Sequence, residues 1–187
     1  VQAGKVRYTG ASNVMDWRLE ETRWLAHQHG YPWYCCVQQR YSYVRPQAGA
    51  IYDPHVAVNE EFLDYTRNRG LTLLAYSPLL RGAYVRDDRD VPEQYRGPDT
   101  RTRLETLARV SEEAGATANQ VVLAWMLQSD PPVIPVISAS RREQLRELLG
   151  ALELRLSAEQ LERLSQAGNS HATHPAAQRS LPRGAKQ

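Results

Sequence analysis

The sequence predicts one α/β domain built on a parallel sheet, and three observations support this fold class. Four short apolar runs with β-forming residues alternate with longer segments that have helical spacing. The chain has 187 residues, of which 42% are hydrophobic, so it is long enough for one domain with a core. Polar residues follow each apolar run, where parallel α/β proteins bind ligands. We place the domain at residues 1–168 and a tail at residues 169–187.

Each apolar run is short enough to be a strand, and the connections between the runs are long enough to hold helices. The predicted strands are residues 6–11, 34–38, 71–76 and 133–137. The predicted helices are residues 16–30, 59–70, 101–115, 118–128, 141–149 and 158–167. Asp16 is a suitable N-cap for the first helix and Gly30 a suitable end. Ser157 precedes the last helix, with Gln160 at the spacing of a capping box.

Two segments have the composition of irregular structure. Residues 81–100 are polar and rich in Asp, Pro and Gly, which predicts a long surface loop of the kind that often covers a binding site. From Asn169 onward Leu181 is the only large aliphatic residue, which predicts a disordered tail.

Charge and composition narrow the expected partners and location. The formal net charge is only +2 and the basic residues are interspersed with acidic ones, so nucleic acid is not an expected partner. No apolar run approaches the ~20 residues of a membrane helix, and no signal pattern is present, so we expect a cytoplasmic protein without membrane association. Adjacent Cys35 and Cys36 are expected to be buried free thiols. We assign no metal site.

Four segments, in order, carry a resemblance to one family. They are GKVRYTGASN at 4–13, VQQRYSYVR at 37–45, GLTLLAYSPLLRG at 70–82, and residues 133–149. Together they resemble the Ser-Asn turn, the Gln-x-x-Tyr-Ser strand end, the Ala-Tyr-Ser-Pro-Leu strand and the adenosine-binding loop of aldo/keto reductases. The family fold is a (β/α)8 TIM barrel, which needs about 250 residues. The resemblance therefore implies four strand-helix units, the carboxyl-terminal half of such a barrel.

The resemblance also implies that the strand ends bind NADPH. The nicotinamide carboxamide is expected at Ser12, Asn13 and Gln38, with Tyr76 stacked on the ring. The turn over the pyrophosphate is expected at Ser77, Leu79, Arg81 and Gly82, and the adenosine phosphate at Ser138, Ala139, Ser140 and Arg141, with Gln144 and Glu147 behind them. Arg141 at a helix start favours NADPH over NADH. The family pattern differs here at Ser138, a frequent glycine, and after Glu147, where Leu148 replaces asparagine.

The residues alone leave plainer interpretations open. Ser12 and Asn13 are common turn residues, an aromatic such as Tyr76 is usually part of a core, and an arginine such as Arg81 is most often solvated. The ordered match of four segments favours the cofactor interpretation over these alternatives.

Hydride reduction of a carbonyl needs a proton donor. The resemblance implies that this donor is a tyrosine tuned by lysine, aspartate and histidine, and that all four come from the first half of the barrel. Lys5 and Lys186 are the only lysines, and neither matches the catalytic one. Tyr41, Tyr43 and His55 are assigned no catalytic role.

We therefore expect an aldo/keto reductase-like NADPH-dependent oxidoreductase for small carbonyl substrates, truncated and inactive alone. The alternative is a non-catalytic cofactor-binding or scaffolding subunit. An open sheet of four strands has unpaired edges, so we also expect a partner, either another copy or an amino-terminal half-barrel.

Overall fold

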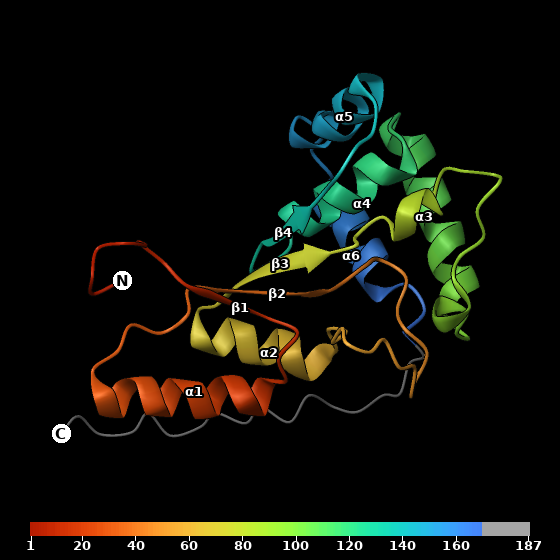
Figure 1. The fold of residues 1–187 in the computed structure, drawn as a ribbon. Coiled ribbons are helices and arrows are strands. Elements are labelled where there is room, and N and C mark those ends of the chain that lie inside the picture. Colours follow the sequence, from red (N-terminus) through yellow and green to blue (C-terminus); the bar gives the residue numbers. More distant parts are fainter. Residues whose placement is uncertain (170–187) are drawn as a thin grey trace.

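The computed structural model of the chain describes residues 1–169 and confirms the predicted α/β class. One or two helices follow each strand along these residues, as Figure 1 shows. The strands are β1 (Gly10–Ser12), β2 (Cys36–Arg40), β3 (Thr72–Tyr76) and β4 (Val133–Val136). The helices are α1 (Asp16–His29), α2 (Glu60–Arg69), α3 (Thr100–Ala114), α4 (Ala118–Leu127), α5 (Arg142–Leu149) and α6 (Ala158–Gln166).

The four strands form one parallel sheet in the order β1-β2-β3-β4. Ser12 pairs with Gln38 in the register of β1 and β2, and Arg40 pairs with Tyr76 in the register of β2 and β3. Tyr76 in turn pairs with Val136 of β4. Because side chains alternate between the faces of a sheet, these five residues share one face.

The opposite face of the sheet is covered by helices and carries the core. Val37 and Ala75 are fully buried, and Leu73 and Val133 nearly so. The helices contribute Leu19, Phe62, Leu107, Met126 and Leu164 to the same cluster. Each such side chain contributes about 1.5–3 kcal/mol when it is removed from water, so this face holds the fold together.

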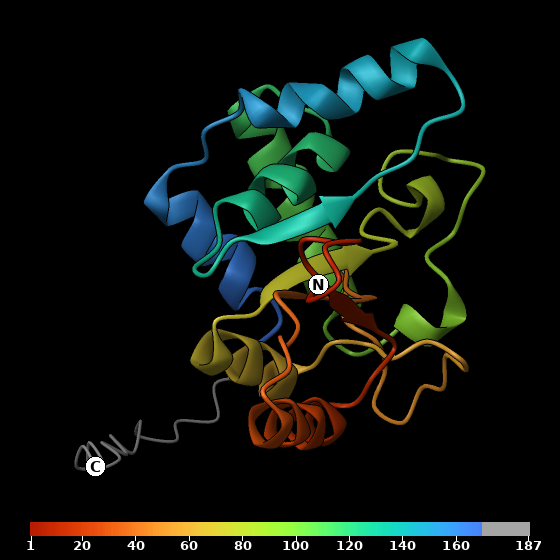
Figure 2. The same ribbon diagram turned by 60° about the vertical axis from the view of Figure 1, so that its left-hand side comes forward.

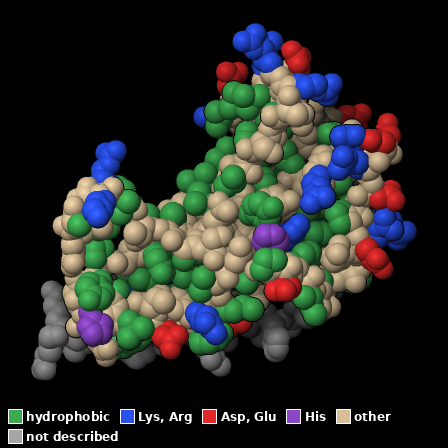
Figure 3. Space-filling view, viewed as in Figure 1, with side chains coloured by type: hydrophobic (Ala, Val, Ile, Leu, Met, Phe, Trp, Pro, Cys, Tyr) green, Lys and Arg blue, Asp and Glu red, His purple; other side chains and the backbone are tan. Residues whose placement is uncertain are grey.

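The face that carries Ser12 and Gln38 is open in the described part of the chain. Tyr76 is 39% exposed, Ile134 45% and Val136 41%. Figure 3 shows the molecule hollowed between its amino-terminal segment and α5 on this side. The open face therefore presents strand-end polar groups at the edge of a concave surface.

Local signals explain most helix ends. Asn59 caps α2 by accepting a hydrogen bond from the Phe62 amide at 2.8 Å, and Gly70, with a φ of 64°, ends it. The capping box at Ser157 is present as predicted. Asp16 was predicted as the N-cap of α1, but Met15 occupies that position and Asp16 begins the helix, where its Oδ1 accepts from the Trp17 amide at 2.8 Å.

Three other predictions need correction or lie outside the structure. The first strand is Gly10–Ser12 rather than residues 6–11, because only these three residues pair with β2 and Tyr8 is 78% exposed. Cys35 is exposed rather than buried, and both cysteines are free thiols. The predicted disordered tail, apart from its first residue, lies outside the described residues.

The region between β3 and α3 is a long irregular connection, as predicted. It contains short 3₁₀ turns at Leu80–Gly82 and Glu93–Tyr95, and Tyr95 is buried. Figure 2, turned from the first view, shows this connection beyond the end of the β3 arrow. Within residues 1–169, no helix has the length and apolar character needed to cross a membrane.

Candidate cofactor and substrate site

The carboxyl ends of the strands bring several predicted cofactor residues together on the open face. Ser12 ends β1 and is exposed, and its register partner Gln38 is half-buried. Tyr76 ends β3 on the same face. A hydroxyl, a carboxamide and an aromatic ring are thus available at one edge of the sheet, which suits a flat heteroaromatic amide.

The turn after β1 is held by Gln39, which is not among the predicted site residues. Gln39 is fully buried, and its Oε1 accepts a hydrogen bond from the Asn13 amide at 2.7 Å. Its Nε2 donates to the Val14 carbonyl at 2.6 Å. Only the alternation of side chains along β2 could have indicated that Gln39 faces inward, opposite to Gln38. Gln39 therefore positions the Ser-Asn turn without reaching the open face.

Backbone strain concentrates at the predicted cofactor turns. Within residues 1–169, the non-glycine residues with positive φ are Asn13 at 55°, Ser77 at 58°, Leu80 at 46° and Arg81 at 59°. Such conformations cost free energy and cluster at functional sites. All four lie in the turns that follow β1 and β3, and three of them were predicted to contact the cofactor.

The turn after β3 packs its apolar residues into the core and exposes its charged residue, Arg81. Leu80 is 3% exposed, and Leu79 packs against both hydrophobic clusters of the domain. Arg81 is exposed and forms no ion pair with any described residue. Gly82 has a φ of 91°, which a side chain rarely tolerates. The turn that follows β3 therefore exposes an arginine with no ion-pair partner in residues 1–169.

The loop between β4 and α5 forms a second polar edge. Ser138, Ser140 and Arg141 are exposed, as is Ala139 between them. Arg141 occupies the N-cap position of α5 without a side-chain capping bond, and Gln144 accepts a hydrogen bond from the Ser140 amide at 3.2 Å. The start of α5 therefore has Arg141 and backbone N–H groups at one exposed end, and binding of an anion there stays a prediction.

Glu147 is engaged with α4 in this structure. Its carboxylate accepts a hydrogen bond from the Thr117 hydroxyl, and its carbonyl accepts one from Gln120 Nε2 at 2.8 Å. Thr117 and Gln120 form the capping box of α4. Glu147 therefore ties α5 to the start of α4, and its role at the adenine stays a prediction.

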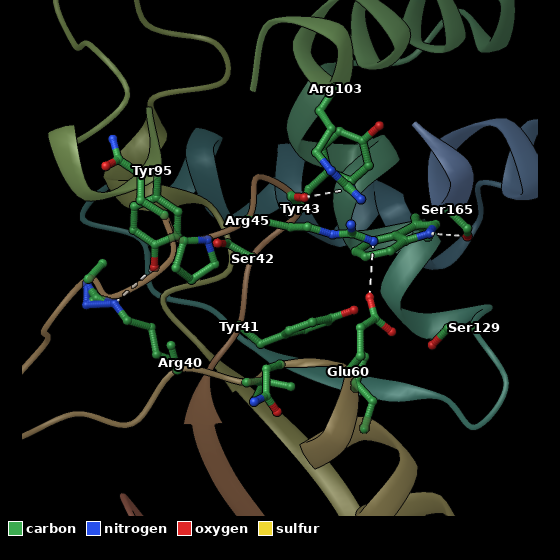
Figure 4. A pocket seen from close by; sticks show the side chains of 18 of the residues that line it. Arg40, Tyr41, Ser42, Tyr43, Arg45, Glu60, Tyr95, Arg103, Ser129 and Ser165 are labelled. Carbon is green, nitrogen blue, oxygen red and sulfur yellow. Dashed lines mark hydrogen bonds and ion pairs between the residues drawn. The ribbon is translucent and has the colours of Figure 1, made fainter. Parts of the chain in front are cut away.

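A pocket beside the segment that follows β2 contains none of the predicted cofactor residues. It has a volume of about 830 Å³ and is lined by the segment after β2 together with parts of α2, α3, α4 and α6 (Figure 4). Tyr41 stacks on Trp125, with ring centroids 6.0 Å apart, and Trp125 Nε1 donates to Ser165 at 3.0 Å. Arg45 pairs with Glu60 at 3.1 Å across the pocket.

A buried arginine fixes the segment that lines this pocket. The Arg103 side chain is 2% exposed, and its Nη1 donates to the Tyr43 carbonyl at 3.0 Å. Its Nε donates to the Asp99 carboxylate at 3.0 Å. Burial raises the pKa of Tyr41 and of Tyr43 to about 12, so both phenols are poor proton donors at neutral pH. This agrees with assigning neither a catalytic role.

Arg40, Tyr52 and Tyr95 line this pocket, and Arg40 also lies on the open face of the sheet beside Tyr76. Arg40 Nε donates to the Tyr95 hydroxyl at 3.1 Å, and the rings of His55 and Tyr76 have centroids 5.2 Å apart.

No group of three or more His, Cys, Asp or Glu side chains suited to a metal ion occurs in residues 1–169.

Comparison with known proteins identifies the class of this parallel α/β chain. The sequence profile of the aldo/keto reductase family matches residues 1–169, and the chain belongs to this family. It is 30% identical to aldo-keto reductase yakc [NADP(+)] of Schizosaccharomyces pombe, over 84% of this chain and 46% of that protein. It is 31% identical to norsolorinic acid reductase stcV of Emericella nidulans, over 86% of this chain and 40% of that protein.

A solved structure of an aldo-keto reductase has a fold similar to that of this chain. The thermostable aldo-keto reductase Tm1743, in complex with the inhibitor epalrestat, superposes with a TM-score of 0.63 at 30% identity. The match covers 89% of this chain and 50% of that one. The chain thus spans about half the length of the relatives it matches.

Proposed function

We propose that this chain supplies the cofactor-binding strand ends of an NADPH-dependent oxidoreductase that interconverts carbonyls and alcohols. The observation that carries the proposal is the strain at Asn13, Ser77 and Arg81, in the turns that the sequence assigns to the cofactor. Family membership supports the reaction type, and a relative whose name includes NADP(+) supports the cofactor.

The described residues fit a dinucleotide phosphate along the open edge of the sheet. Ser12 and Gln38 offer hydrogen bonds to the nicotinamide amide, and the exposed face of Tyr76 offers a surface for its ring. Arg81 and Arg141 offer charge to the phosphates. The bound cofactor supplies a hydride, and the task of these residues is to present one face of its ring to a carbonyl substrate.

A non-catalytic cofactor-binding role is the second candidate. Burial raises the pKa of Tyr41 and Tyr43, which makes these two phenols poor proton donors at neutral pH. The reduction needs such a donor, and we assign none of the described residues to this task. Binding of NADPH without turnover is therefore the behaviour that would favour the second candidate.

The test uses the protein at its natural full length. NADPH binding is followed by fluorescence titration, and turnover by the loss of NADPH absorbance with a panel of aldehydes. Tyr76→Ala should weaken NADPH binding about fivefold or more, because aromatic contacts contribute about 0.5–1.5 kcal/mol beyond burial. Tyr31→Ala, which removes an exposed tyrosine after α1, is the matched control. Absence of NADPH binding would rule out both candidates, and equal losses in the two variants would remove Tyr76 from the site.

A further inference from the structure

Arg40 ends β2 on the open face, directly beside Tyr76 in the register of the sheet. Its Nε donates to the Tyr95 hydroxyl at 3.1 Å, but neither of its Nη groups donates to any described residue. Within residues 1–169 it also forms no ion pair, whereas Arg45 nearby pairs with Glu60. A guanidinium with a free pair of Nη groups has the geometry that binds a carboxylate through two hydrogen bonds.

The walls around Arg40 are aromatic. Its guanidinium carbon lies 4.9 Å from the ring centroid of Tyr52 and 5.9 Å from that of Tyr76. His55 packs against Tyr76, and its Nδ1 is buried without a hydrogen-bond partner among the described residues. Buried polar groups are normally satisfied, so this atom is a second sign that a polar ligand is accommodated here.

The tyrosines around Arg40 do not neutralise it. Burial raises the pKa of both Tyr52 and Tyr95, so both phenols stay protonated and uncharged at neutral pH. The charge of Arg40 is therefore left for a partner from outside the described chain.

The backbone holds Arg40 in place from both sides. Its amide donates to the Val56 carbonyl at 3.0 Å, and its carbonyl accepts from the Val58 amide at 2.9 Å. Tyr52 is tied by its hydroxyl to the Gln94 carbonyl at 3.1 Å. The bond from Nε to Tyr95 and the stacking on Tyr52 restrain the guanidinium itself, so it loses little conformational freedom when it binds a ligand.

We propose that Arg40 is a specificity-determining residue that binds a carboxylate on the carbonyl substrate, so that the protein selects aromatic aldehydes or ketones bearing an acidic group. This inference rests on the proposed function, because Tyr76 is where that function places the nicotinamide, next to Arg40. The Tyr52 ring accounts for the aromatic part of the substrate, and the Nη groups, which have no partner among the described residues, account for the acid. A purely structural role would use only the stacking on Tyr52 and the single bond to Tyr95.

The first test measures binding without turnover, on the protein at its natural full length. Calorimetric titrations compare benzoate with benzamide, which has the same shape but no charge. We expect wild-type protein to bind benzoate about tenfold more tightly or better, and Arg40→Met to abolish this preference. Arg101→Met, in which a side chain that is 90% exposed is changed, should keep it. Equal affinities of the wild-type protein for the two ligands would overturn the proposal, as would loss of the preference in both variants.

The second test separates specificity from structure. Arg40→Met should raise the KM for carboxybenzaldehyde about tenfold and leave the KM for benzaldehyde unchanged, with kcat little altered for either. Equal loss of kcat for both substrates would show that Arg40 only supports the fold. If Arg40→Met does not fold, Arg40→Lys keeps the charge but loses the planar fork, and it should retain only part of the preference for benzoate. A full preference in Arg40→Lys would contradict bidentate binding.

NADPH titration on the same wild-type sample distinguishes the two proposals. Preference for benzoate without NADPH binding would refute the proposed function and leave the anion site in place. NADPH binding without a preference for benzoate would refute only the role of Arg40.

Discussion

Replacing Arg103 with methionine should destabilise the domain by about 3–5 kcal/mol, the range for removing one partner of a buried ion pair. Methionine has a similar length, so the apolar part of the packing is largely kept. The Asp99 side chain, 16% exposed, would lose its charged partner, and the Tyr43 carbonyl would lose a hydrogen bond of 3.0 Å. The effect should therefore come from unpaired polar groups rather than from a cavity.

The control for this prediction lies on the same helix. Arg101 is 90% exposed and approaches Glu105 only at 3.9 Å, so Arg101→Met should cost about 0.5 kcal/mol or less. Urea unfolding of the protein at its natural full length, followed by circular dichroism, gives both free energies. Adding Asp99→Asn to Arg103→Met should recover part of the loss, because it removes the uncompensated charge. If the two single variants differ by less than about 1 kcal/mol, the claim that Arg103 is a buried, paired cation is refuted.

The remaining predictions concern the cofactor and acid stability. Arg141→Met should weaken the binding of NADPH about tenfold more than that of NADH, because Arg141 is expected to contact the extra phosphate. Ser12→Ala should weaken the binding of both cofactors alike. Equal losses of affinity for the two cofactors in Arg141→Met, measured by fluorescence titration, would contradict the assignment. The hydrogen bond from Arg23 chiefly lowers the pKa of Glu20 from 4.5 to about 2. This carboxylate stabilises the fold fully above about pH 4.5, and the contribution is lost as the pH falls toward 2. In Glu20→Gln the free energy of unfolding should therefore change less with pH between about 4.5 and 2 than in the wild-type protein. The same pH dependence in both proteins, measured by urea unfolding, would contradict this prediction.

The sequence pattern predicted the parallel sheet and the residues at its strand ends. Alternation of strand-forming and helical segments predicted a parallel sheet, and the described strands are parallel in chain order. The polar residues after each predicted strand do lie at strand ends, since parallel strands place their carboxyl ends at one edge. The expectation that a partner covers the open face stays a prediction.

Two pairs of like residues differ in burial in a way that the sequence does not predict. Gln38 and Gln39 are neighbours of the same type, yet one lies on the open face and the other is fully buried and holds the Asn13 turn. Arg103 is one of many arginines in the sequence, and nothing in its neighbours distinguishes it from solvated Arg101. Such differences arise from contacts with residues distant along the chain.

The sequence by itself determined the fold class, the family and the strand ends that form the candidate site, because these depend on local propensity and on motifs with a fixed order. Only the tertiary structure decided which polar side chains have hydrogen-bonding atoms without a partner among the described residues. Arg40, for example, stands beside Tyr76, 36 positions away by their numbers, because strand register aligns them. Among residues 1–169 its charge has no ion-pair partner, because the loops bring the uncharged tyrosines Tyr52 and Tyr95 near it. The pairing of a charge depends on neighbours in space, which no local pattern of residues specifies.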